Sequence, residues 1–236
     1  MARISLFCAC AVLLTACRPE SESMIRQLSE LESPRYDGGE IPDERIRELR
    51  EGIRLHQEQI RATVQSARQL SVYHRMLAIE YINRSMYGLA LEELDRAIRI
   101  EPENPQLFYY AGVSAARFAK AMVDSGERER YLSRAEAFYL RAIELDSRHV
   151  NSLYGLAVLY SFEMDRPEEA EPLLTRILDR QARNVQAMAL LARVYATTDR
   201  LEEAARMYTQ LADITGDPDI RREALRNRDL VREAMR

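Results

Sequence analysis

The sequence predicts an all-α protein built from stacked helical hairpins, and two observations predict it. Apolar residues recur at intervals of three, four and seven residues, which is the spacing of one face of an α-helix. Small and large residues then return in the same order four times between residues 71 and 218. Small residues suit places where two helices approach closely, and large residues fill the space between helices. The repeated order therefore indicates repeated pairs of helices.

The chain begins with the features of a secretory signal. A positive charge at Arg3 precedes an apolar run that is too short to cross a membrane. The run ends at residues 14–17 in Leu-Thr-Ala-Cys, which resembles the lipobox of bacterial lipoproteins. The resemblance implies that residues 1–16 are a lipoprotein signal peptide and that the Cys17 thiol carries lipid; two or three acyl chains together give stable anchoring. The alternative is an ordinary signal peptide that ends in a chance cysteine.

Two segments separate this signal from the repeats. Residues 17–41 contain scattered proline, glycine and serine, and we expect a lipidated, flexible tether. Residues 42–70 form an N-terminal helix segment, with Pro42 and two acids at its start and a helix predicted over about 43–68. We expect its apolar stripe to pack onto the repeats. The stripe consists of Ile46, Leu49, Ile53, Ile60, Val64, Ala67 and Leu70.

The repeats share a small residue in the first helix, a further small or aromatic residue after it, and an alanine in the second helix. In chain order these are Ala78, Tyr81 and Ala90; Gly112, Ala115 and Ala135; Ala157, Tyr160 and Ala170; Ala192, Tyr195 and Ala204. The pattern resembles the tetratricopeptide repeat, whose period is about 34 residues. The resemblance covers 71–218 and implies a right-handed superhelix of helix hairpins. Its units are 71–104, 105–149, 150–184 and 185–218.

Two parts depart from this pattern. The second unit is about eleven residues longer than the usual period, around 120–132, with a break expected at Gly126. The extra residues should lengthen one or both helices or add a loop. Residues 219–236 have an apolar stripe among arginines, and we expect a C-terminal capping helix that covers the last repeat. A basic docking site is the alternative for this segment.

The residue types argue against catalysis, metal binding and nucleic acid. Cys8 and Cys10 lie in the predicted signal and Cys17 carries the predicted lipid, so no cysteine is left for a thiolate site. The histidines are not at metal-binding spacing, and no glycine-rich phosphate loop is present. The formal net charge of −4 argues against nucleic acid as the main ligand. We therefore predict no enzyme activity, no cofactor and no metal site.

The resemblance implies that the first helix of each pair lines a concave groove. Arginine, asparagine and aromatic side chains there suit a protein partner, because arginine holds carboxylates and aromatic rings give contact area at low entropy cost. The lysine and asparagine pattern by which some family members clamp chaperone tails is not reproduced. The alternative is that helix 43–68 lies in the groove and closes it. The predicted groove residues are Arg75, Asn83, Tyr109, Arg117, Asn151, Tyr154, Phe162 and Arg193.

These features favour a membrane-anchored scaffold for protein–protein interaction in the cell envelope, with an envelope protein or peptide as its partner. Arg18 follows the predicted lipidated cysteine where an aspartate would retain the protein at the inner membrane, so we expect the periplasmic face of the outer membrane. One alternative is a ligand-channel accessory protein that docks a periplasmic solute-binding protein of a transporter. A channel predicts that Arg117, Tyr154 and Arg193 converge on a closed cavity, whereas a scaffold predicts an open trough. A structural homo-oligomer is the second alternative, since the sequence leaves the oligomeric state open.

Overall fold

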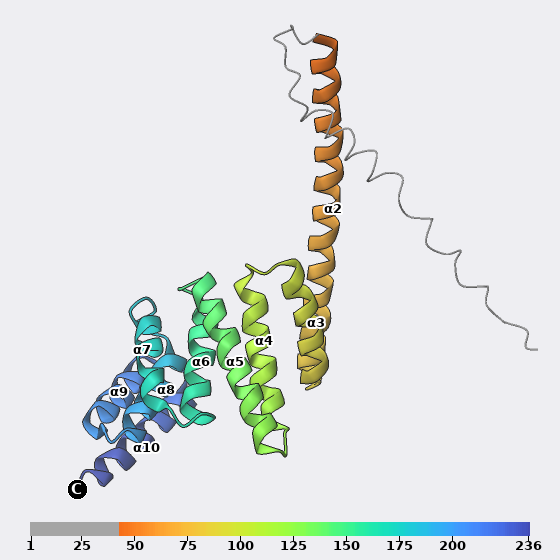
Figure 1. The fold of residues 1–236 in the computed structure, drawn as a ribbon. Coiled ribbons are helices and arrows are strands. Elements are labelled where there is room, and N and C mark those ends of the chain that lie inside the picture. The colour runs from red at the N-terminus through yellow and green to blue at the C-terminus, as the bar shows by residue number, and fades with distance from the viewer. Residues whose placement is uncertain (1–42) are drawn as a thin grey trace, which may run out of the picture. The chain divides into compact units, whose positions relative to one another are not determined.

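The computed structural model describes residues 43–236, and every regular element in that range is an α-helix (Figure 1). The chain divides into two units, one that ends at Glu58 and one that comprises Gln59–Arg236. The described residues of the first unit are the N-terminal part of helix α2 (Asp43–Asn83). The predicted signal peptide, the tether and the lipidation at Cys17 lie outside the described residues.

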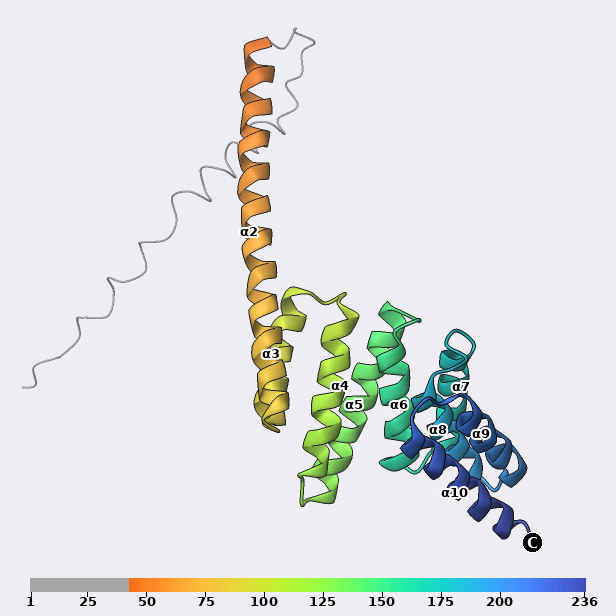
Figure 2. The same cartoon turned by 180° about the vertical axis from the view of Figure 1, so that it is seen from behind.

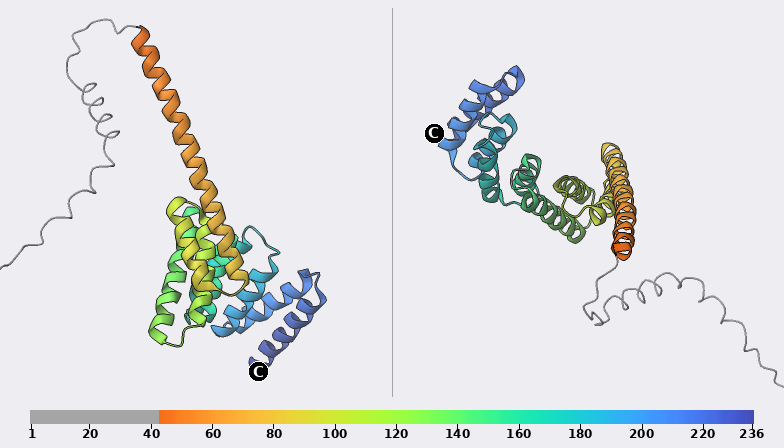
Figure 3. Two further views of the ribbon diagram at one scale, coloured as in Figure 1. Left: turned by 90° about the vertical axis from the view of Figure 1, so that its right-hand side faces the viewer. Right: turned by 90° about the horizontal axis from the view of Figure 1, so that it is seen from above.

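The second unit is a row of helical hairpins. The end of α2 pairs with α3, and this joint includes hydrogen bonds from Ser71 to Glu101 at 2.5 Å and between His74 and Glu93 at 2.6 Å. The next pairs are α4 with α5, α6 with α7 and α8 with α9, each packed against its neighbours and followed by α10. Viewed from above, α3 to α10 follow one another in a curved row (Figure 3). The helices are α3 (Tyr87–Ile100), α4 (Pro105–Lys120), α5 (Ser125–Leu145), α6 (Val150–Phe162), α7 (Pro167–Leu178), α8 (Val185–Thr197), α9 (Leu201–Ile214) and α10 (Pro218–Ala234).

The core confirms the predicted all-α fold of stacked hairpins. The small residues at the repeat positions have no exposed surface and let the paired helices approach closely. Larger residues such as Leu94, Leu156 and Leu174 are also fully buried between them. The repeat alanines with no exposed surface are Ala78, Ala90, Ala115, Ala135, Ala157, Ala170, Ala192 and Ala204.

Three hairpins share the same turn. In each, one residue adopts the left-handed conformation, and the residue after it donates its backbone N–H to the carbonyl of a repeat tyrosine. The left-handed residues are Ser85, Asp165 and Asp199, with φ of 59°, 53° and 59°. The hydrogen bonds run from Met86 to Tyr81, Arg166 to Tyr160 and Arg200 to Tyr195, at 2.8, 3.0 and 2.8 Å. The first helix of each of these hairpins therefore ends without a glycine. The left-handed conformation of the three residues costs some free energy.

The second hairpin turns differently, and the expected break at Gly126 is wrong. Helix α4 ends at Lys120 and α5 begins at Ser125, so Gly126 lies in the first turn of α5. The Asp124 carboxylate accepts a hydrogen bond from the backbone N–H of Glu127 at 2.8 Å and thereby caps α5. The extra residues lengthen both helices of this hairpin. Helix α4 has 16 residues, whereas α6 and α8 have 13, and α5 has 21 residues, whereas α7 has 12 and α9 has 14. Capping decides the helix start here more strongly than the nearby glycine.

Helix α2 also differs from expectation. We expected the N-terminal helix to end near residue 68, but α2 continues to Asn83 as the first helix of the first hairpin. No glycine or proline between 68 and 83 interrupts it. The predicted packing of its stripe is wrong for the part in the second unit, since Ile60, Val64 and Leu70 are 62%, 45% and 49% exposed.

Helix α10 follows the last hairpin and lies against α9 (Figure 2). Asp217 caps it, with Pro218 as its first residue. Ala224 and Val231 are buried in one apolar cluster with Tyr208 and other residues of α8 and α9. Within residues 43–236, no helix combines the length and the apolar character needed to cross a membrane.

Candidate functional site

Two adjoining cavities lie on the face that presents α4, α6, α8 and α10. The first, here called the α4–α6 cavity, has a volume of about 400 Å³. The second, the α8–α10 cavity, has a volume of about 340 Å³. Tyr154 and Gln186 line both cavities, so the two are parts of one groove. Each volume is within the range of ligand pockets in proteins, about 300–1,000 Å³.

The floor of the α4–α6 cavity is built around Tyr139 of α5. Its ring lies between Gly112 of α4 and Gly155 of α6, and a Cβ atom at either glycine would stand 2.7 Å from the ring. Only glycine therefore leaves room for this side chain at both contacts. Burial raises the pKa of Tyr139, so its hydroxyl remains protonated and able to donate a hydrogen bond. Tyr109 extends the aromatic wall, with its ring centroid 6.4 Å from that of Tyr139.

Positive charge predominates in the α4–α6 cavity. The Lys120 ammonium lies 2.6 Å from Glu163, and the Arg128 guanidinium lies 3.3 Å from the other oxygen of the same carboxylate. The Glu163 side chain is 9% exposed, whereas both cations are about half exposed. Arg117 also lines the cavity, is exposed, and forms no ion pair within residues 43–236. Two cations share one carboxylate and a third cation is unpaired.

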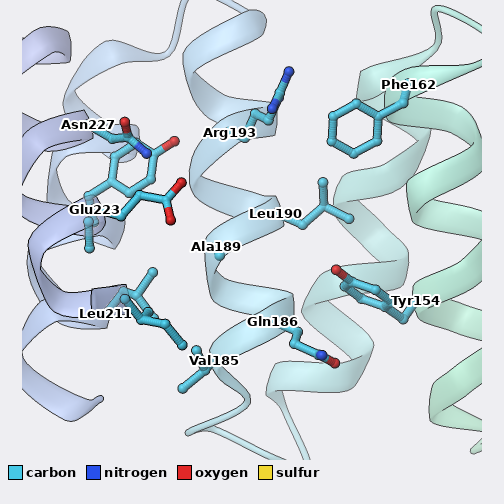
Figure 4. Close-up of a pocket in the computed structure, with 13 residues that line it drawn as sticks. Tyr154, Phe162, Val185, Gln186, Ala189, Leu190, Arg193, Leu211, Glu223 and Asn227 are labelled. Atoms are coloured by element: carbon cyan, nitrogen blue, oxygen red, sulfur yellow. The ribbon is translucent and has the colours of Figure 1, made fainter. Parts of the chain in front are cut away.

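The α8–α10 cavity has an apolar floor and a polar rim (Figure 4). Ala189 and Leu190 of α8 form part of the floor. On one side, the Arg193 guanidinium lies over the Phe162 ring, 4.5 Å from its centroid. On the other side, the Glu223 carboxylate points from α10 toward α8 (Figure 4). A cation and an anion thus lie on opposite sides of the same cavity.

Two tyrosines, Tyr154 and Tyr208, also line this cavity. The Tyr208 pKa is raised by burial, while Arg193 opposes the rise and Glu223 adds to it. Both charged groups therefore act on the Tyr208 hydroxyl. Tyr154 points its hydroxyl into the cavity from α6, and burial raises its pKa as well. Both hydroxyls stay protonated near neutral pH and can donate or accept a hydrogen bond.

The groove contains most of the residues predicted from the repeat register. The α4–α6 cavity holds Tyr109, Arg117, Asn151 and Tyr154. The α8–α10 cavity holds Tyr154, Phe162 and Arg193. Arg75 and Asn83, both on α2, line neither cavity.

Other groove residues were not predicted. Tyr139 comes from the second helix of a hairpin, and Glu223 and Asn227 come from the capping helix, so the projection of first helices omitted them. Lys120 and Glu163 stand where α4 ends and just after α6, and no sequence signal placed them together.

The geometry bears on the choice between a trough and a channel. Arg117 and Arg193 are both exposed and line different cavities, so Arg117, Tyr154 and Arg193 do not converge on one enclosed space. Phe162 is 43% exposed, as expected for an open trough. Residues 59–83 of α2 line neither cavity.

The histidines have structural partners. His74 is hydrogen-bonded to Glu93, and His149 caps α6 through Ser152. Within the described range, no group of three or more histidine, cysteine, aspartate or glutamate side chains is placed to hold a metal ion.

Comparison with known proteins identifies the repeat. A family model described as "Tetratricopeptide repeat" matches residues 161–228. A "TPR repeat-containing protein" of Borreliella burgdorferi is 24% identical over 167 residues, which cover 71% of this chain and 72% of that protein.

Solved structures show the same fold. YrrB, described as a TPR protein with an unusual peptide-binding site, has a TM-score of 0.57 at 15% identity, over 74% of this chain and 82% of that one. MamA of Desulfovibrio magneticus RS-1 has a TM-score of 0.55 at 18% identity, over 70% and 94%. The pilF protein of Pseudomonas aeruginosa also has a TM-score of 0.55 at 18% identity, over 72% and 74%. Residues 161–228 thus match the tetratricopeptide repeat, and the stacked hairpins have the fold of a tetratricopeptide-repeat solenoid.

Proposed function

We propose that this protein is an interaction scaffold that holds an extended segment of a partner protein in the groove from α4 to α10. The observation that carries the proposal is the continuity of the groove. Because Tyr154 and Gln186 line both cavities, one chain segment can pass from the α4–α6 cavity into the α8–α10 cavity. The solved structure of YrrB, a repeat protein with a peptide-binding site, gives a precedent for this use of the fold.

The groove has the hydrogen-bonding groups that a peptide backbone needs. Asn151 of α6, Gln186 of α8 and Asn227 of α10 each present a side-chain amide. A side-chain amide both donates and accepts, as does each peptide unit. None of the three has a hydrogen-bond partner within residues 43–236. Because packed helices lie about 8–10 Å apart and an extended chain advances about 3.3 Å per residue, the amides of α6, α8 and α10 can bind peptide units about three residues apart.

A protein segment fits the groove better than an enclosed small solute. Small-molecule sites usually bury about 70–90% of the ligand's surface. Here Arg117, Asn151 and Arg193 are exposed on the rim, which leaves one side of any ligand open to water. Tyr109 and Tyr154 offer large, stiff contact surfaces of the kind that bind peptides at low entropy cost.

Site-specific photo-crosslinking tests the groove. A benzoylphenylalanine at Asn151 or at Gln186 should give a light-dependent adduct of one defined mass in the native envelope. The same probe at Thr175, exposed on α7 and outside both cavities, is the control and should give no such adduct. Equal adducts at all three positions, or adducts at Thr175 only, would contradict the proposed groove.

The membrane anchor is the second part of the proposal. The Leu-Thr-Ala-Cys sequence at 14–17 supports lipidation of Cys17, and Arg18 supports the periplasmic face of the outer membrane. Cells fed radioactive palmitate should label the wild type and the Cys10→Ala control, whereas Cys17→Ala should be unlabelled and leave the membrane fraction. Equal labelling of Cys17→Ala would reject the anchor. Separation of inner and outer membranes then tests the location.

A further inference from the structure

We infer that the segment bound in the groove is charge-polarised, with an acidic side chain toward α4, an apolar centre, and a basic side chain toward α10. The inference rests on the proposed function and adds the chemistry of the partner. It follows from the unequal distribution of charge along the groove.

The α4 end attracts a carboxylate. The charged residues that line this cavity are Arg117, Lys120 and Glu163, and Arg128 contacts Glu163 from α5. One carboxylate thus neutralises one of three cations, and the nearly buried Glu163 is already engaged on both oxygens. The unpaired Arg117 can hold an incoming carboxylate through two parallel N–H donors. Tyr139 adds a protonated hydroxyl at the floor.

The centre of the groove attracts an apolar side chain. Ala189 and Leu190 form the floor, and Tyr154 stands between the two cavities. Figure 4 shows these residues around the open middle of the α8–α10 cavity. Burial of one apolar side chain here removes surface from water on both partners.

The α10 end attracts an ammonium or guanidinium group. Glu223 is exposed and forms no ion pair within residues 43–236. Asn227 lies one turn after Glu223 on α10 and lines the same cavity, so a lysine ammonium could meet an acceptor from each of these two residues. Arg193 lies in the same cavity, but its guanidinium is stacked on Phe162 at the α6 side. Among the residues that the structure describes, the helix that caps the solenoid therefore also supplies the one carboxylate that lines this cavity.

The spacing of the helices sets the length of the segment. Packed helices lie about 8–10 Å apart, so the path from α4 across α6 and α8 to α10 measures roughly 25–30 Å. An extended chain covers this path with about eight residues at about 3.3 Å each. The acidic and basic residues should thus be separated by about that number of residues.

Four fluorescein-labelled peptides test the inference. Each has the same central leucine and tyrosine and the same length of about ten extended residues; the ends are acid and base, acid and acid, base and base, or neutral. Kd values are measured by anisotropy with the full-length chain in detergent. Wild type should bind the acid–base peptide about three- to fivefold more tightly than the neutral one, since exposed ion pairs contribute modestly. The base–base peptide should bind more weakly than the acid–base peptide.

Charge reversals in the protein should reorder the peptides. Arg117→Glu should make the base–base peptide the tightest ligand, and Glu223→Arg should make the acid–acid peptide the tightest. These expected changes in the tightest ligand do not depend on the direction in which the peptide lies, because the four peptides differ in the charges that they carry. Arg180→Glu and Glu92→Arg change the charge equally at exposed positions that line neither cavity, so they should keep the wild-type order. Circular dichroism confirms that each variant is folded.

The outcomes separate this inference from the proposed function. Gln186→Trp places a bulky ring where the two cavities meet and should block binding of every peptide. The proposed polarity is wrong if the peptides bind without charge preference, or if the charge reversals leave their order unchanged. If Gln186→Trp still blocks binding in that case, the proposed binding in the groove is supported. If Gln186→Trp leaves binding intact, the groove is wrong too. If no peptide binds, the polarity is rejected, and the crosslinks at Asn151 and Gln186 decide the groove.

Discussion

In the α6–α7 and α8–α9 hairpins, an arginine four residues before the repeat alanine of the second helix lies over a tyrosine of the first helix. The α4–α5 hairpin has Tyr131 at this repeat position, within α5 rather than at its start. Arg166 lies 4.4 Å from the ring of Tyr160 and pairs with Glu136 of the preceding hairpin. Arg200 lies 4.3 Å from the ring of Tyr195 and pairs with Glu171 at 2.6 Å.

The α4–α5 hairpin makes the same joint with apolar contacts. Tyr131 packs edge-on against Phe118, with ring centroids 4.7 Å apart. Its turn has no left-handed residue, and its longer second helix carries Arg128 to Glu163. The hairpins therefore share the small residues that let helices stack, while their turns and joints differ. The stacking is the common constraint, and the differences set the charge of the groove.

The largest expected effect is at the joint between the second and third hairpins. Tyr139→Ala should lower the free energy of unfolding by about 3–5 kcal/mol, because it empties the space between Gly112 and Gly155. Urea unfolding followed by circular dichroism measures the loss. Tyr73→Ala, at a tyrosine that is 59% exposed, is the control and should cost less than about 0.5 kcal/mol. Similar losses in the two variants would show that the Tyr139 ring does not hold the joint.

A smaller loss should follow Gly112→Ala, about 1–3 kcal/mol, because the added Cβ would stand 2.7 Å from the Tyr139 ring. The third hairpin has Ala157 and Leu174 at the corresponding positions, both buried. Tyr139→Leu should therefore reduce the cost of Gly112→Ala in a double-mutant cycle. An unchanged cost in the Tyr139→Leu background would mean that the ring does not require the glycine.

The two kinds of turn should respond with opposite signs. Asp199→Gly should raise the free energy of unfolding by about 0.5–1 kcal/mol, because glycine adopts the left-handed conformation without strain. Asp124→Ala should lower it by about 1 kcal/mol, because the cap on Glu127 is lost. Thermal unfolding of both variants checks the signs. A lower free energy of unfolding in Asp199→Gly would show that the Asp199 carboxylate stabilises the fold by more than its left-handed backbone conformation costs.

The smallest expected effect concerns pH. His149 caps α6, at the position where Asn104 caps α4 and Asn184 caps α8. Burial lowers the His149 pKa below its usual 6.5, so the folded state binds fewer protons than the unfolded state. The stabilisation is present above pH 6.5 and is lost as the pH falls below that value toward the folded-state pKa.

His149→Asn should keep the cap and weaken this pH dependence. Urea midpoints at about pH 7.5 and pH 5.5 should differ less in the variant than in the wild type, since asparagine does not titrate in this range. If the midpoints at the two pH values differ equally in the variant and the wild type, other groups cause the pH dependence.

The sequence by itself determined the helical fold and the stacking of hairpins. Apolar periodicity can be read within each segment of the sequence. The recurrence of Ala78, Ala157 and Ala192 at one repeat position indicates where paired helices are in close contact. The same register placed Tyr109, Arg117, Asn151 and Tyr154 on the groove-facing side of the first helices, where the structure finds them. The lipidation of Cys17 remains a prediction, since that residue lies outside the described range.

Only the tertiary structure decided which polar groups share the groove. Tyr139 enters from a second helix, Glu223 from the capping helix, and Arg128 from the added length of α5. The left-handed turns at Asp165 and Asp199 carried no glycine signal either. A repeating pattern specifies which face of each helix is apolar. It does not specify helix lengths or the angles between packed helices, and these set where the ends of long side chains meet.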